Sequence, residues 1–133
     1  GNYPMSDVIA AFLTELVRAA RAGRAFAMTG GKQTRDFLHA DDAARALVKA
    51  AIKPGLGVEP VEVGSGASVP LKEAARLAEK IAGRRFVRLG EVPYRKDEIW
   101  RYAVDARRAR RLLGWRPRVT LAAGLRGLLS GKD

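Results

Sequence analysis

The chain has 133 residues, of which 47% are hydrophobic, so its length and composition suit one ordinary globular domain. It contains no cysteine and a single histidine, which excludes disulfides and thiolate metal sites and argues against a histidine-based zinc site. The 25 basic and 14 acidic residues give a net charge of +11, which favours anionic partners: phosphorylated small molecules, nucleic acid or an anionic surface. No apolar run reaches the roughly 20 residues of a membrane span and no signal peptide opens the chain, so we expect a cytoplasmic protein.

Hydrophobic periodicity and capping residues divide the chain into helices and short strands. In chain order the predicted elements are helix 7–22 capped by Ser6, strand 24–29, strand 35–39, helix 42–53 capped by Asp41, strand 61–63, helix 71–82, strand 86–89, the extended stretch 101–104, helix 106–113 capped by Asp105, and a helix from the Thr120 cap through Leu129. This order predicts an α/β protein with short strands and several helices.

Two of these helices have faces that bear on function. Helix 42–53 carries an apolar face made of Ala44, Leu47, Val48, Ala51 and Ile52. Helix 106–113 turns Ala109, Leu112 and Leu113 inward, and its arginines at 107, 108, 110 and 111 lie mostly outward. That division is typical of a solvated helix surface, so nucleic acid is not the expected partner.

Arg35 is placed to meet an anion. It follows the Gly30-Gly31 turn at the start of strand 35–39, and its planar guanidinium suits phosphate oxygens. The segment by itself leaves a second interpretation open, an ion pair with Asp36 or Asp41. Arg95 raises the same choice, because the carboxylates at 97 and 98 follow it closely.

The single histidine, His39, lies on the same predicted strand. Histidine is a common general base near neutral pH. However, no serine, cysteine or paired carboxylate stands at motif spacing from it, so we interpret it as structural.

Four segments carry a family resemblance. They are Gln33–Ala43 (QTRDFLHADDA), Val61–Gly66 (VEVGSG), Arg95–Ile99 (RKDEI) and Leu112–Pro117 (LLGWRP), the last followed by Thr120-Leu121 and Gly124-Leu125. In order and spacing they resemble the extended short-chain dehydrogenase/reductases, the NAD(P)-dependent nucleotide-sugar epimerases, dehydratases and reductases. The resemblance covers nearly the whole chain but only the C-terminal part of such an enzyme. It implies that residues 1–133 are a single nucleotide-sugar-binding domain or fragment from which the N-terminal Rossmann core is absent.

The resemblance also implies a substrate site. Arginines at the positions of Arg35 and Arg95 bind the diphosphate of the nucleotide-sugar in the family, and a carboxylate at the position of Glu98 accepts the ribose hydroxyls. Main-chain groups at the positions of Phe26 and Met28 contact the base. The residues alone leave two other interpretations open: Phe26 as a core residue and Glu98 as a surface carboxylate.

Three positions depart from the family pattern. Asp7 replaces an asparagine near the start of the first helix, where a carboxylate would repel phosphate. Thr29 replaces the glycine that follows the first strand, and Glu62 replaces another asparagine. The diphosphate contact at position 7 is therefore not expected in this chain.

The family's catalytic groups are not found in the sequence. It has no glycine-rich dinucleotide fingerprint, and no tyrosine has a lysine four residues later. We therefore expect NAD or NADP in the complete enzyme, none on this chain alone, and no catalytic residue here. The expected partners are a nucleotide-diphosphate-sugar and either the missing N-terminal Rossmann domain or a second copy. The alternatives are a non-catalytic nucleotide-binding accessory module and a basic nucleic-acid-binding domain.

Overall fold

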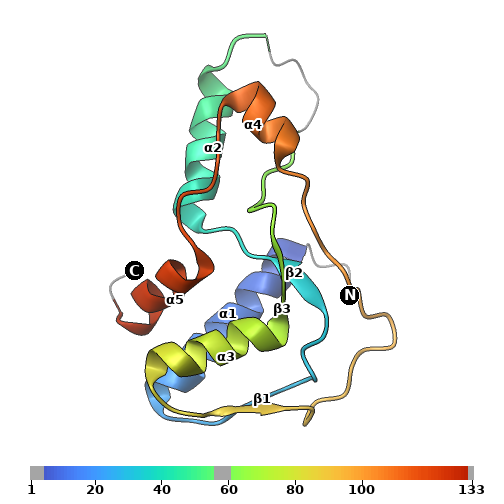
Figure 1. Ribbon diagram of the computed structural model, residues 1–133, viewed down its shortest axis with the longest axis vertical. Helices are drawn as coiled ribbons and strands as arrows, with labels where there is room; N and C mark the ends of the chain where they lie inside the picture. The colour runs from blue at the N-terminus through green and yellow to red at the C-terminus, as the bar shows by residue number, and fades with distance from the viewer. Residues whose placement is uncertain (1–4, 56–60, 132–133) are drawn as a thin grey trace.

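The helices and strands form a lower body and an upper arm (Figure 1). The computed structural model describes residues 5–55 and 61–131. Within these ranges the elements are α1 (Met5–Ala22), β1 (Phe26–Met28), β2 (Thr34–Asp36), α2 (Ala40–Ile52), β3 (Ser68–Pro70), α3 (Leu71–Ala82), β4 (Val87–Leu89), α4 (Arg107–Leu113) and α5 (Leu121–Leu129). We call α1, α3, α5, the four strands and the segment 90–102 the body, and α2, α4 and the turn through Trp115 the arm. The predicted α/β class with short strands and several helices is confirmed.

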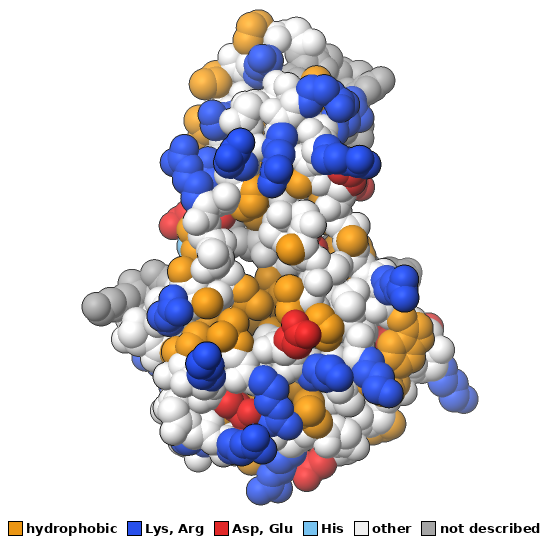
Figure 2. All heavy atoms as spheres, viewed as in Figure 1, with side chains coloured by type: hydrophobic (Ala, Val, Ile, Leu, Met, Phe, Trp, Pro, Cys, Tyr) orange, Lys and Arg blue, Asp and Glu red, His pale blue; other side chains and the backbone are white. Residues whose placement is uncertain are grey.

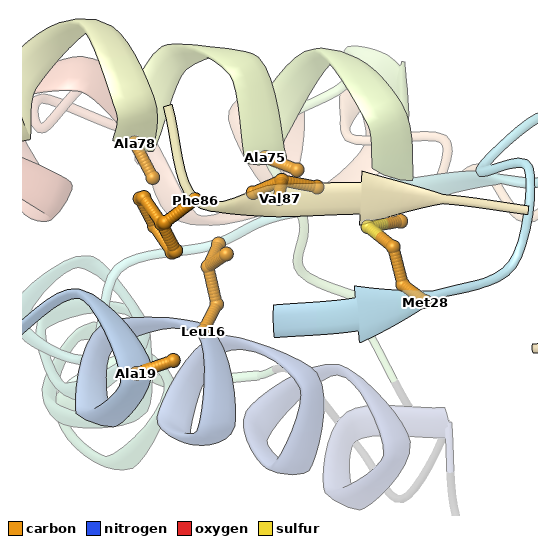
Figure 3. Close-up of a cluster of buried hydrophobic side chains, with 7 residues drawn as sticks. All are labelled: Leu16, Ala19, Met28, Ala75, Ala78, Phe86 and Val87. Carbon is orange, nitrogen blue, oxygen red and sulfur yellow. The ribbon is translucent and has the colours of Figure 1, made fainter. Parts of the chain in front are cut away.

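The body encloses the larger apolar core. β1 and β4 pair in parallel, with Phe26 opposite Val87, and helices α1, α3 and α5 pack on one another around them. Figure 3 shows side chains of α1 and α3 pointing toward the β4 region from opposite sides. The buried cluster consists of Leu16, Ala19, Met28, Ala75, Ala78, Phe86 and Val87. The small alanine side chains let α1 and α3 approach the strands closely.

A buried carboxylate joins α3 to β4. Glu79 accepts the backbone N–H groups of Phe86 and Val87, both at 2.9 Å, and pairs with Arg76 at 2.7 Å. Burial alone raises the pKa of Glu79, but these bonds together lower it below its ordinary value. The ionised carboxylate therefore stabilises the start of the strand.

A second carboxylate closes the turn that leads into the antiparallel pair β2–β3. Asp36 accepts the N–H groups of Ser65 at 2.8 Å and Gly66 at 3.0 Å. Residue 64 must be a glycine here, because a Cβ would lie 2.6 Å from the Val104 side chain and 3.0 Å from Asp36. The turn of the VEVGSG segment is thus fixed by the aspartate of the QTRDF segment.

The arm has a small core of its own, around Trp115. This side chain is 1% exposed, and its Nε1 donates to the carbonyl oxygen of Asp42 at 2.9 Å. The Asp42 carboxylate accepts the N–H groups of Arg118 and Val119 and pairs with Arg45. Burial raises the pKa of Asp42, but the bonds from Arg45 and the two backbone groups together lower it. Asp42 therefore connects the start of α2 to the segment 116–120, which leads into α5.

The apolar face predicted for α2 is exposed. Leu47, Val48 and Ile52 have exposed fractions of 72%, 60% and 75%. The buried side of the helix is instead occupied by Asp42 and Ala46, which lie toward α4 and Trp115. The pattern located the stripe correctly, but no described residue covers it.

Several element boundaries differ from the sequence-based expectation. α1 begins at Met5 rather than after a Ser6 cap, and the strand predicted over 35–39 begins one residue earlier, at Thr34, and ends three residues earlier, at Asp36. Residues 61–63 form no strand, since they pack against the arm without a ladder partner. β3 was not predicted, because Ser68-Val69-Pro70 has no alternating pattern.

The cap of α2 was also assigned to the wrong residue. α2 begins at Ala40, so the capping position falls on His39, whose Nδ1 accepts the N–H of Asp41 at 3.1 Å. Asp41 lies inside the first turn. The Thr120 cap is confirmed, since its side chain accepts the N–H of Ala123. Among the described residues, no helix is long and apolar enough to cross a membrane.

Candidate functional site

Charged groups from distant parts of the sequence meet in one pocket, which we call the arginine pocket. It encloses about 290 Å³ between the first half of α1, β2 and the segment 92–99. Its polar lining comes from Thr29, Gln33, Arg35, Arg95, Asp97 and Glu98. Apolar side chains of α1, namely Val8, Ile9 and Phe12, form the opposite wall.

Arg35 is buried in the floor of this pocket, with 4% of its surface exposed. Its Nη1 donates to the carbonyl oxygens of Thr34 and Ile99, both at 2.7 Å. Its Nη2 lies 2.8 Å from Oε1 of Glu98, a residue 63 positions later. The ion pairs considered from the sequence, with Asp36 or Asp41, are not formed: Asp36 closes the Ser65 turn, and Asp41 lies beside His39.

The segment that carries Arg95 is irregular but fixed to the rest of the body. The hydroxyl oxygen of Tyr94 accepts the N–H of Lys32 at 3.1 Å, and a Cβ on Gly30 would lie 2.6 Å from that oxygen. The Tyr94 ring also packs edge-on against Trp100, with centroids 4.6 Å apart. These contacts were not predicted, although the glycine pair and the tyrosine beside Arg95 were visible signals.

Arg95 lies on the exposed side of the same pocket. Its carbonyl oxygen accepts the N–H of Glu98 at 3.3 Å, a turn that brings the two side chains to one site. Three of the predicted site residues, Arg35, Arg95 and Glu98, therefore line one pocket. An exposed arginine beside a buried one is an arrangement that can meet a phosphate group from two sides.

Phe26 and Met28 do not line the arginine pocket. Met28 is 6% exposed in the body core, and the Phe26 ring packs against Phe12 with centroids 6.0 Å apart. The N–H of Phe26 donates to Phe86, and the carbonyl oxygen of Met28 accepts from Val92. These two main-chain groups already have partners, so the contact with a base stays a prediction.

A second cavity lies at the junction of the arm and the body. It encloses about 410 Å³ and is lined mainly by apolar residues, among them Leu13, Phe37, Leu121, Leu125 and Leu128. Figure 2 shows hydrophobic side chains gathered in the middle of the drawn face, between the two parts. Among the described residues that line this cavity, the charged or titratable side chains are His39 and Asp41, and His39 is engaged in capping α2. The arginine pocket is therefore the better site for an anion.

The described residues suit neither a metal ion nor a dinucleotide. Within them, no three acidic or histidine side chains are grouped to hold a metal. The strands of the described ranges pair only as β1–β4 and β2–β3, and no glycine-rich turn leads from a strand into a helix to receive a pyrophosphate. We therefore derive no reaction step from NAD(P) in this chain.

The fold and the QTRDF arginine define the class as the Rossmann-type extended short-chain dehydrogenase/reductases. A family model described as GDP-mannose 4,6 dehydratase matches residues 3–128, and the chain belongs to this family of nucleotide-sugar epimerases and dehydratases.

Named relatives agree with this assignment. The putative GDP-L-fucose synthase 2 of Oryza sativa subsp. japonica is 35% identical over 125 residues, covering 92% of this chain and 35% of the relative. The UDP-glucose 4-epimerase of Thermotoga maritima, solved with UDP-glucose, superposes with a TM-score of 0.79 at 26% identity, covering 89% of this chain and 38% of that one. MoeE5, solved with UDP-glucose and NAD, gives 0.79 at 29% identity, covering 90% and 40%. The chain thus spans well under half the length of these relatives.

Proposed function

We propose that the chain is the nucleotide-diphosphate-sugar-binding portion of an NAD(P)-dependent epimerase, dehydratase or reductase. The observation that carries this proposal is the meeting of Arg35, Arg95 and Glu98 in one pocket, from segments 60 residues apart in the sequence. UDP-glucose in two solved relatives supports the substrate class. Catalytic groups and the cofactor belong, in this proposal, to the part of the enzyme outside these residues.

Each group has a distinct task in the proposed site. Arg95, on the exposed side, meets the diphosphate first, and a charged donor to a phosphate oxygen is about twice as strong as a neutral one. Arg35 is held in place by the carbonyl oxygens of Thr34 and Ile99, so its position is set before any ligand arrives. The Glu98 carboxylate accepts hydrogen bonds from the ribose hydroxyl groups.

The exposed face of α2 fits a partner within the same enzyme. Leu47, Val48 and Ile52 form an apolar stripe that no described residue covers. The chain spans 35% of its plant relative, so most of such an enzyme lies outside these residues. We propose that the N-terminal Rossmann part packs on this stripe, and that the 133-residue chain alone self-associates through it. The cytoplasmic location remains a prediction.

Replacement of Arg95 tests the proposed site. In the full-length protein, Arg95→Ala should weaken binding of UDP, dTDP, GDP or CDP, whichever binds, by roughly 10- to 150-fold, since a hydrogen bond to a charged group contributes about 1.5–3 kcal/mol. Calorimetric titration measures the change.

Lys96→Ala is the matched control. Lys96 is the next residue along the exposed segment, but it does not line the pocket, so affinity should stay within about twofold. Equal losses in the two variants, or unchanged affinity in Arg95→Ala, would contradict the proposed site.

A further inference from the structure

The arginine pocket is electrically balanced before any ligand enters. Arg35 and Arg95 contribute two positive charges, and Asp97 and Glu98 contribute two negative charges. A site that only had to attract a diphosphate would gain nothing from two carboxylates at its edge, because like charges oppose binding. The placement of one of them, Glu98, suggests a more specific purpose.

Glu98 is already bonded to the guanidinium that a phosphate would need. The Arg35–Glu98 pair is 2.8 Å long, and only 5% and 10% of the two side chains are exposed. Arg35 has five N–H donors, and its hydrogen bonds to Thr34, Ile99 and Glu98 engage three of them. An anion approaching Arg35 therefore meets a carboxylate already bonded to it.

We propose that Glu98 is a specificity-determining residue that closes Arg35 to simple phosphates and releases it only to a nucleotide. This inference rests on the proposed function. A ribose offers hydroxyl donors to the Glu98 carboxylate while its diphosphate replaces that carboxylate on Arg35, so both members of the buried pair keep partners. Free pyrophosphate offers a new partner to Arg35 alone. It leaves Glu98 unpaired and beside a second anion, which is costly in a buried place.

This exchange, in which the diphosphate replaces the Glu98 carboxylate on Arg35, predicts opposite effects of one substitution on two ligands. In the full-length protein, Glu98→Gln removes the negative charge and keeps the side-chain shape. Calorimetry should show pyrophosphate binding about tenfold more tightly than in the wild type, and UDP binding more weakly because the charged acceptor for the ribose is lost. Thermal unfolding verifies that the variant is folded.

Asp97→Asn is the matched control for charge. Asp97 lines the same pocket and is exposed, so its removal changes the local charge equally without touching Arg35. We expect a change of about twofold or less in pyrophosphate affinity, because solvent screens an exposed carboxylate. A gain equal to that of Glu98→Gln would show a general charge effect and overturn the proposal, as would no gain in Glu98→Gln.

A measurement on the wild type needs no variant. A nucleoside that engages Glu98 frees Arg35, so uridine, thymidine, guanosine or cytidine should raise the affinity for pyrophosphate, and pyrophosphate should raise the affinity for the nucleoside by the same factor. We expect about fivefold or more for the nucleoside whose base fits. Independent or mutually antagonistic binding of all four would overturn the exchange.

Failure of this inference is distinguishable from failure of the proposed function. If no nucleoside diphosphate binds, or if binding ignores Arg95, the proposed site is wrong and the exchange falls with it. If UDP or another nucleoside diphosphate binds through Arg95 but pyrophosphate affinity fails to respond to Glu98→Gln, or fails to respond to every nucleoside, only the exchange is wrong.

Discussion

The body and the arm differ in how much of their apolar surface is buried. The body encloses its core from both sides, and residues such as Leu16, Ala75 and Ala78 have no exposed surface. The arm packs one helix against another and leaves Leu47 and Ile52 at 72% and 75% exposure. The body therefore has a closed apolar core, whereas the arm leaves an apolar face that no described residue covers.

Each part also contains a buried carboxylate that binds backbone N–H groups. Glu79 in the body and Asp42 in the arm each accept two consecutive backbone N–H groups and pair with an arginine three residues away. The same device therefore serves both parts. The two parts differ in how far the apolar side chains near these carboxylates are buried, and substitutions can measure that difference.

The largest expected effect is the contrast between Leu16 and Leu47. Leu16→Ala should cost roughly 2–5 kcal/mol of unfolding free energy in any form of the protein, because it opens a cavity in the body core. Leu47→Ala should stay within about 0.5 kcal/mol in the dilute 133-residue chain, where the side chain is solvated. In the full-length protein its cost should approach that of a buried leucine. Urea denaturation of both lengths gives the values.

This contrast has its own check. A large cost of Leu47→Ala in the short chain that grows with protein concentration would mean that self-association covers α2. A large cost that does not depend on concentration would show that α2 is buried within the monomer, and the comparison between body and arm would be wrong.

The next effect in size is acid sensitivity. The pKa values of Asp42 and Glu79 are lowered from their ordinary values of 3.8 and 4.5, so each carboxylate stabilises the fold above those values. That stability is lost as pH falls below about 4 and through the lower folded-state pKa values. Asp42→Asn should cost about 1–3 kcal/mol near neutral pH and reduce the loss on acidification.

Trp115 reports on Asp42 directly. It is buried against Asp42, whereas Trp100 is 48% exposed in the pocket segment. In a Trp100→Phe background, Trp115 fluorescence should therefore follow the arm. A Glu79→Gln variant in the same background is the control for the body. If Asp42→Asn leaves the acid transition of Trp115 unchanged, Asp42 does not set the pH dependence of the arm.

The sequence predicted elements that depend on local pattern. α3 was predicted with the bounds that the structure shows, because its alanine and leucine spacing and the Gly83 stop are local signals. The Thr120 cap of α5 is a local signal of the same kind. The arginine pocket was reached through the family resemblance, and the sequence could not show that Arg35 pairs with a carboxylate 63 residues away.

Errors occurred where a partner decides the outcome. Val61 and Val63 were predicted to form a strand, because valine favours strands. A strand also requires a neighbouring strand, and within the described residues these two side chains pack against the arm instead. α2 was given its correct apolar stripe, but periodicity does not say what covers a stripe. His39 caps α2, a role that the sequence did not indicate because it depends on a helix start two residues earlier than predicted.

The smallest expected effect concerns the basic surface of the arm. Figure 2 shows Lys and Arg side chains in a band across the upper part of the molecule, and the four arginines of α4 are exposed. One of them, Arg107, lies against Asp105 at 2.8 Å, and its side-chain and backbone hydrogen bonds lower the pKa of Asp105 to about 2. None of the four lines the arginine pocket. A quadruple Arg→Gln variant at 107, 108, 110 and 111 should therefore keep UDP affinity within about twofold, the scale of surface substitutions.

The same variant separates the arm from the pocket as the reason for the net charge of +11. If that charge exists for a small diphosphate, UDP binding should be lost in an Arg35→Ala/Arg95→Ala variant and kept in the quadruple variant. If it exists for nucleic acid, wild-type binding to DNA or RNA should weaken steeply with salt, and the quadruple variant should flatten the slope by about 0.9 for each phosphate that it no longer neutralises. Because Arg35 is buried, the double variant is compared with Arg95→Ala alone and checked for folding by thermal unfolding. Retained UDP binding in both pocket variants, together with a flattened salt slope in the quadruple variant, would move the functional surface from the body to the arm.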